Sequence, residues 1–194
     1  MDILWWEKTV EYFFVQKYVD IKTFVAPLDG NHENVGDAIF SNESMWILIE
    51  FKRDKKSISD ELGKFINFAE AKEALESEGA HHLIIYGESE SADFYLKCQQ
   101  YFSGLPILLE DALKSGIEKD LFVKYLQKLI EYKKQSQGGS GGYGFVAGVS
   151  NDGTVTRCMK LSEFAEALHL EKILKQKLQQ RPQQSSYSRP RMGR

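Results

Sequence analysis

The most constraining part of the chain is the stretch Gly36 to Lys52, where two short apolar runs are separated by four turn-prone residues. The second run, Trp46 to Ile49, leads directly to Glu50 and Lys52, with one residue between the two charges. Residues two apart on a strand point to the same face, so Glu50 and Lys52 should stand side by side where the strand leaves the interior. Charged groups in such a place need a partner, a metal ion or water.

The position of Asp37 depends on the turn of this expected hairpin. If residues 41–44 form an even-numbered loop, residues 37–40 pair with 45–48 and Asp37 shares the face of Glu50 and Lys52. Diagonal neighbours across such a pair are about 7–8 Å apart at the backbone, so one metal ion could bridge Asp37 and Glu50. An odd-numbered loop would turn Asp37 to the other face.

Composition limits the classes of protein that the chain can belong to. With 194 residues, 42% of them hydrophobic and 27% charged, it reads as a globular protein with one core. No apolar run approaches the roughly 18 residues of a membrane span, the first residues lack the basic start of a signal peptide, and the two cysteines have no ligand spacing. These features predict a cytoplasmic protein that does not enter a membrane.

Charge is spread unevenly along the chain. The net charge is −3, and residues 181–194 carry four arginines and no acid, which leaves −7 for residues 1–180. An acidic body argues against general attraction to nucleic acid. We therefore expect any contact with nucleic acid to use a local basic patch, the tail or a partner.

Hydrophobic periodicity and turn residues predict helices and strands in an order typical of a mixed β-sheet covered by helices. The expected elements are a helix over 3–19, a strand over 21–28, the hairpin 36–52, a helix from 57 or 59 to 78, a strand over 82–86, a helix around 90–102, a strand over 106–109 and a helix over 118–135.

A glycine-rich stretch divides the chain in this interpretation. Residues 136–144 resemble a flexible linker more than a phosphate-binding loop, because they lack the spacing and the lysine of the known phosphate-binding motifs. The linker separates a domain over 1–135 from a β-hairpin and helix over 145–180, which we expect to be an appendage. Residues 181–194 have the composition of a disordered basic tail.

The order of elements over residues 3–87 resembles the PD-(D/E)XK nuclease superfamily, whose core is helix, three strands, helix and strand. Asp37 matches the first acid of the motif, and Glu50 with Lys52 matches its (D/E)xK part. Gly36 stands where the family name has proline. The resemblance implies a restriction-endonuclease-like fold of the α/β (α+β mixed) class.

The resemblance also implies a site and a reaction. Asp37, Glu50 and the main-chain carbonyl of Phe51 would hold Mg²⁺ or Mn²⁺, while Lys52 would orient a water molecule or stabilise developing charge. An acid from the first helix, Glu7 or Glu11, would join them, with Glu11 favoured. Four basic residues would contact nucleic-acid phosphates: Arg53, Lys55, Lys56 and Lys64.

Two functions follow as expectations. The first is a metal-dependent DNA endonuclease in restriction or phage defence, acting as a homo-oligomer or within a larger complex. The second is a catalytically silent member of the fold that binds nucleic acid or protein. A simpler interpretation of Glu50 and Lys52 is an ion pair at a strand end, and exposed pairs of this kind contribute only about 0–1 kcal/mol.

Overall fold

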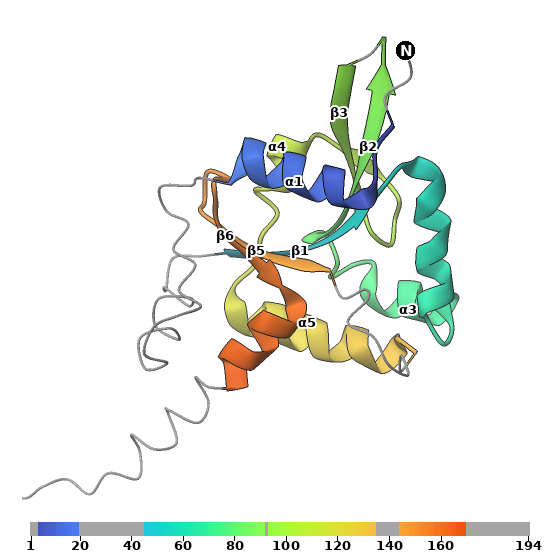
Figure 1. The fold of residues 1–194 in the computed structure, drawn as a ribbon. Coiled ribbons are helices and arrows are strands. Elements are labelled where there is room, and N and C mark those ends of the chain that lie inside the picture. The colour runs from blue at the N-terminus through green and yellow to red at the C-terminus, as the bar shows by residue number, and fades with distance from the viewer. Residues whose placement is uncertain (1–3, 20–44, 92, 135–143, 170–194) are drawn as a thin grey trace, which may run out of the picture.

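The computed structural model describes residues 4–19, 45–91, 93–134 and 144–169, and these residues are arranged around one mixed β-sheet (Figure 1). Over the described residues the sheet has six strands in the order β4-β3-β2-β1-β5-β6. The strands are β1 (Met45–Lys52), β2 (His82–Glu90), β3 (Asp93–Gln100), β4 (Pro106–Ile107), β5 (Phe145–Val149) and β6 (Val155–Lys160). Only β1 and β2 are parallel, and every other neighbouring pair is antiparallel.

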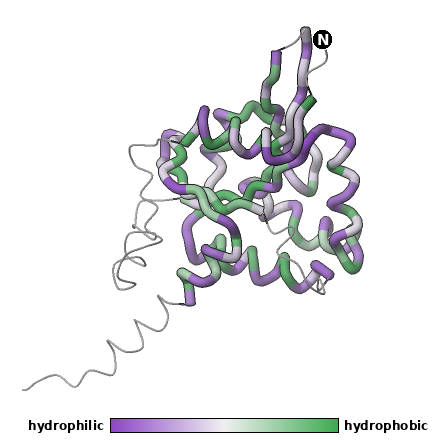
Figure 2. The backbone as a smooth tube through the Cα atoms, in the orientation of Figure 1, coloured by the Kyte–Doolittle hydropathy of each residue, from purple (hydrophilic) through white to green (hydrophobic). Residues whose placement is uncertain are grey.

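Helices cover both faces of the sheet. On one face lie α1 (Glu7–Tyr18) and the short α4 (Leu109–Ala112), whose apolar side chains pack on the odd-numbered residues of β1. On the other face lie α5 (Lys119–Tyr132) and a helix over 161–169, which pack on Trp46 and Leu48. Residues 46–49 of the central strand β1 are therefore apolar on both faces, as expected for a strand buried on both faces. Figure 2 shows the backbone coloured by hydropathy, with hydrophobic segments in the sheet.

Several elements confirm the expectations from the sequence. The helix α1, the buried strand β2, the short strand β4, the helix α5 and the hairpin β5–β6 all lie within or close to their expected ranges. The strand expected over 21–28 and the part of the last helix beyond residue 169 lie outside the described residues. Within the described residues, no helix is long and apolar enough to cross a bilayer.

The long helix expected up to residue 78 is instead two elements. The 3₁₀ helix η1 (Lys55–Lys64) and the helix α3 (Phe68–Leu75) are separated by three residues, of which Asn67 caps α3 by accepting hydrogen bonds from the main-chain amides of Ala69 and Glu70. Main-chain pairing explains the break, because the amide of Ile66 donates to the carbonyl of Tyr132 at 2.9 Å. The chain between η1 and α3 is therefore extended against the end of α5.

The helix expected around 90–102 is wrong, since these residues form β3. It pairs with β2 along its whole length, from Leu83 opposite Gln100 to Glu90 opposite Asp93. Ser91 in the connecting turn has a φ of 53°, the left-handed conformation that tight hairpin turns require. Long-range pairing with β2 thus overrides the weak local preference of this segment.

The C-terminal hairpin is part of the central sheet and not an appendage. The strand β5 pairs with β1 from Met45 opposite Val149 to Ile49 opposite Phe145. The other edge of β1 is hydrogen-bonded to Ile117 and to β2. Both edges of β1 therefore have partners among the described residues, whereas residues 37–40 of the expected hairpin lie outside the described residues.

Candidate functional site

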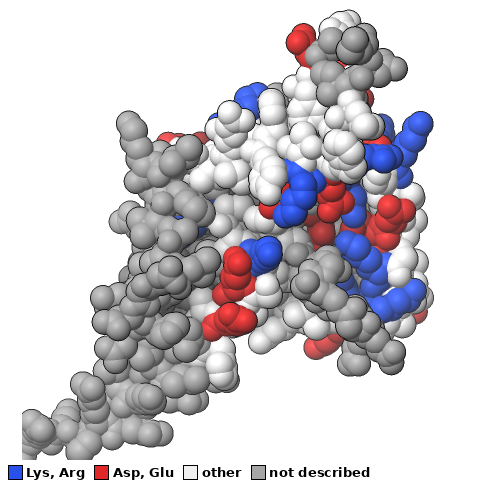
Figure 3. Space-filling view, in the orientation of Figure 1, with Lys and Arg blue, Asp and Glu red and all other residues white. Residues whose placement is uncertain are grey.

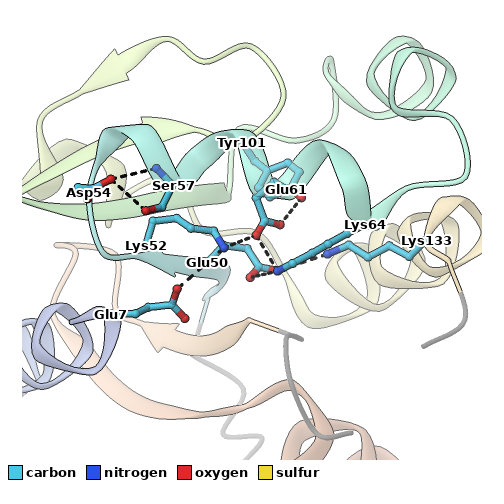
Figure 4. A network of polar contacts seen from close by, with 9 residues as sticks. All are labelled: Glu7, Glu50, Lys52, Asp54, Ser57, Glu61, Lys64, Tyr101 and Lys133. Carbon is cyan, nitrogen blue, oxygen red and sulfur yellow. Dashed lines mark hydrogen bonds and ion pairs between the residues drawn. The ribbon is translucent and has the colours of Figure 1, made fainter. Parts of the chain in front are cut away.

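Glu50 and Lys52 lie side by side near the end of β1, on the face that also carries Trp46 and Leu48. Only 4% of Glu50 and 6% of Lys52 is exposed. The sequence expectation that both charges share one face of a buried strand is consistent with this geometry. Buried charges are retained only with partners, and those partners define the site (Figure 4).

The partner of Lys52 is Glu61, which the sequence did not single out. The Nζ atom of Lys52 lies 2.6 Å from Oε1 of Glu61, and the hydroxyl of Tyr101 donates to Oε2 of Glu61 at 2.7 Å. Asp54 starts η1 by accepting hydrogen bonds from the main-chain amide and the hydroxyl of Ser57. A 3₁₀ helix has three residues per turn, so Ile58, Glu61 and Lys64 lie on its inner face, a pattern that a 3.6-residue period conceals.

Two further lysines complete the cluster. Lys64 reaches Oε1 of Glu61 at 2.6 Å and Oε2 of Glu50 at 3.7 Å. Lys133, at the end of α5, reaches Oε1 of Glu50 at 3.3 Å, and its ammonium group lies 5.3 Å from the ring centre of Phe65. We call Glu50, Lys52, Glu61, Lys64 and Lys133 the buried charge cluster.

The two carboxylates of the buried charge cluster have different electrostatic surroundings. Burial raises the pKa of Glu50, and the nearby ammonium group of Lys133 opposes that shift only in part. Burial also acts on Glu61, but hydrogen bonds from Lys52 and Lys64 outweigh it and hold the pKa of Glu61 below its ordinary value. Pairs of acids whose surroundings push their pKa values apart are typical of catalytic sites, although structural ion-pair networks also produce them.

The first-helix acids divide between the site and the surface. Glu7 lies 4.0 Å from Nζ of Lys52 with 59% of its side chain exposed. Glu11 instead pairs with Lys8 at 2.6 Å. The described contacts therefore bring Glu7 to the cluster, whereas the sequence interpretation favoured Glu11.

Asp37 lies outside the described residues, so its place in the site stays a prediction. The carbonyl of Phe51 has a clearer position. Leu48 donates to the carbonyl of His81, so the even-numbered residues of β1 face β2 and the odd-numbered ones face β5. Among the described residues, the pairing of β1 with β5 ends at Ile49. Phe51 is the next residue of β1 whose main-chain groups face this edge.

The basic residues expected to contact nucleic acid differ in their contacts and exposure. Lys64 belongs to the buried charge cluster. Arg53 is paired with Asp54 at 2.8 Å, and Lys55 and Lys56 are exposed at the start of η1. Figure 3 shows basic and acidic side chains intermixed on the face that it displays. Among the described residues, this basic run is a neighbour of the cluster and not a broad positive surface.

One position in the buried charge cluster lies between two carboxylates. The described residues contain no group of three or more histidines, cysteines or acids placed to hold a metal ion. However, the ammonium group of Lys64 is shared by the carboxylates of Glu50 and Glu61, so both acids already face one cation. Lys64 keeps 30% of its side chain exposed. Two carboxylates and a main-chain carbonyl are donors that Mg²⁺ prefers.

Two buried histidines lie behind the cluster. His82 stacks on the ring of Tyr101 with 3.8 Å between ring centres, and its Nδ1 atom lies 2.8 Å from the hydroxyl of Tyr125. His81 packs against Tyr125 with 4.5 Å between ring centres. Burial lowers the pKa of His81 from 6.5 to about 4. Both side chains are fully enclosed, so protonating either would place a charge in the core.

Stability should therefore fall on acidification below the ordinary histidine pKa. The folded-state pKa of His81 lies below 6.5, so the unfolded chain takes up the proton first. Its contribution is complete above pH 6.5 and is lost as the pH falls toward 4, by about 1.4 kcal/mol per pH unit. Urea unfolding between pH 7 and 5 measures this slope, and His81→Phe should show a shallower one. Equal slopes in both proteins would contradict the assignment.

Comparison with known proteins adds no relative. No protein-family model matches the chain, and no curated protein and no solved structure is significantly similar to it. The functional argument therefore depends on the buried charge cluster and on its chemistry.

Proposed function

We propose that the chain is a divalent-metal-dependent nuclease that hydrolyses phosphodiester bonds. The observation that carries the proposal is the burial of Glu50 and Lys52 side by side at the end of a central strand, in contact with a second acid, Glu61. Glu50, Lys52 and the intervening Phe51 match the ExK part of the PD-(D/E)XK motif. Burial of charged groups is energetically unfavourable, and it is typical of catalytic sites.

The cation would be held by Glu50 and Glu61, with the carbonyl of Phe51 as a third donor. Glu61 thus supplies the second carboxylate that the sequence assigned to Asp37. When bound, Mg²⁺ or Mn²⁺ would lower the pKa of a water molecule and offset negative charge on the phosphate. Lys64 now occupies the position between the two acids, so it would leave that position and be free to contact the phosphate.

The other residues of the cluster would position the reacting groups. Lys52 is held by Glu61 on one side and approached by exposed Glu7 on the other, so its ammonium group is fixed where it could orient water or stabilise an anionic transition state. Lys133 keeps Glu50 in place from the far side. The resemblance to the nuclease superfamily points to DNA as substrate, in restriction or phage defence.

A second candidate is a catalytically silent member of the fold that binds nucleic acid or protein. The observation that favours it is the pairing within the cluster. Glu50 already contacts Lys64 and Lys133. Glu61 already contacts two lysines and the hydroxyl of Tyr101. A network satisfied in this way can exist for structure alone. The two candidates differ in whether a cation can enter.

Metal binding and cleavage together test the proposal. The full chain is titrated with Mn²⁺, with binding followed by calorimetry and by electron paramagnetic resonance, and is then incubated with plasmid, linear and single-stranded DNA and with RNA. We expect Mn²⁺ to bind and cleavage to require Mg²⁺ or Mn²⁺ and to stop with EDTA. Absence of Mn²⁺ binding would overturn the nuclease proposal in favour of the silent one.

A further inference from the structure

The outer edge of β3 has an open segment. The strand β4 pairs with β3 only at Cys98 and Gln99, so among the described residues Asp93 to Lys97 have no strand on this side. The segment belongs to the β2–β3 hairpin, which projects beyond the rest of the sheet (Figure 1). Open edges offer unpaired main-chain groups to another strand.

The direction of the main-chain groups is set by the neighbouring strands. Gln100 donates to the carbonyl of Leu105, beside β4, and Tyr101 donates to the carbonyl of His82, in β2. Even-numbered residues of β3 therefore point their amides and carbonyls outward. Within the open segment these are Phe94 and Leu96.

The open segment is complementary to itself in sequence. If two copies pair antiparallel with Tyr95 opposite Tyr95, then Phe94 lies opposite Leu96 and Asp93 lies opposite Lys97. Phe94 and Leu96 would exchange hydrogen bonds, because both point outward. Asp93 and Lys97 would form the closer, non-hydrogen-bonded pairs, with opposite charges adjacent. The Phe94–Leu96 and Asp93–Lys97 pairs each occur twice by symmetry, and the Tyr95 pair lies on the axis.

The same structure limits the register. Cys98 is already paired with Ile107 of β4, so a partner strand cannot extend past Lys97. The hairpin turn, with Ser91 in the left-handed conformation, ends the segment on the other side. Pairing about Tyr95 uses all positions between these limits, and any other antiparallel register uses fewer.

We propose that a second copy of this chain pairs with the β3 edge over Asp93 to Lys97 and forms a symmetric dimer with one continuous sheet. Residues opposed across strands share a face, so Lys97 shares the face of Tyr86 and of Lys52. Both buried charge clusters would then lie on the same side of the sheet, five strand spacings or roughly 24 Å apart across it. The dimer does not depend on the proposed nuclease activity.

Charge reversal in the full chain tests the dimer by sedimentation over a range of concentrations. The wild-type protein should dimerise. Lys97→Glu and Asp93→Lys should each weaken dimerisation about tenfold, since each replaces two attractive pairs by two repulsive ones. The double variant Asp93→Lys with Lys97→Glu restores opposite charges and should recover the wild-type affinity. Wild-type protein that stays monomeric, or a dimer that neither single variant weakens, would overturn the proposal.

Disulfide trapping provides an independent test of the register. Tyr95→Cys places two thiols opposite each other on the symmetry axis, at a backbone separation of about 4.5 Å that a disulfide can span. Lys97→Cys is the matched control, since its two copies would lie about 13 Å apart. Oxidation should give a covalent dimer for Tyr95→Cys well above the level for the control and for wild-type protein. Equal yields for all three would contradict pairing about Tyr95.

Discussion

Glu50→Gln should lower metal-dependent cleavage on the order of a thousandfold, the loss expected when several kcal/mol of metal-mediated stabilisation are removed. The amide keeps the shape of the side chain but cannot supply a charged oxygen ligand. Cleavage rates with Mg²⁺ and Mn²⁺, together with the affinity for Mn²⁺, measure the effect. Both should fall, because Glu50 is proposed to touch the ion directly.

Matched variants separate the chemical effect from a general loss of structure. Glu73→Gln removes an exposed acid of α3 and should change neither cleavage nor metal affinity. Lys52→Met should reduce cleavage but retain Mn²⁺ binding, because Lys52 is proposed to position reacting groups and not to bind the ion. Asp37→Ala asks whether that acid takes part. Full cleavage by Glu50→Gln, with folding verified by circular dichroism, would contradict the proposed site.

Glu61→Ala should destabilise the fold by about 3–5 kcal/mol, the usual cost of leaving buried charge without its partner. The substitution removes the close carboxylate from Lys52 and Lys64 and the hydrogen-bond acceptor from Tyr101. Among the described residues, the acid that remains near Lys52 is exposed Glu7, at 4.0 Å. The free energy of unfolding in urea at pH 7 measures the loss.

Glu76→Ala is the control for this comparison. It removes an exposed acid that pairs with Lys72 at 3.7 Å, with 41% of each side chain exposed. Exposed helix pairs contribute a few tenths of a kcal/mol, so the expected change is small. If Glu61→Ala were no more destabilising than Glu76→Ala, the buried charge cluster would not hold the fold together.

The strongest local patterns in the sequence were sufficient to predict the centre of the structure. The apolar run before Glu50 and Lys52 predicts β1 and the shared face of its two charges, and the run at residues 82–86 predicts the parallel β2. A mixed sheet covered by helices follows from the order of elements. The restriction-endonuclease-like core and the catalytic roles of Asp37, Glu50 and Lys52 stay predictions.

Long-range competition accounts for what the sequence could not predict. Residues 38–40 and β5 are both short apolar runs, and nothing local indicates that Phe145–Val149 pairs with the edge of β1. The segment of β3 has mixed composition, so its state is decided by β2. Glu61 belongs to no sequence motif, and the 3₁₀ period of η1 places it beside Lys64. Lys133 is a basic residue of a kind that is common at helix ends.

Lys133 and Gly144, which flank the glycine-rich stretch, both lie close to Glu50. Lys133 contacts Oε1 of Glu50, and a Cβ atom on Gly144 would lie 3.2 Å from Cδ of Glu50. The described residues on either side of the stretch therefore lie beside the same carboxylate, and the strand that follows it pairs with β1. The entropy of closing a loop grows only slowly with its length. Changes in its length should thus cost little, whereas a side chain at Gly144 would collide with the backbone of Ile49.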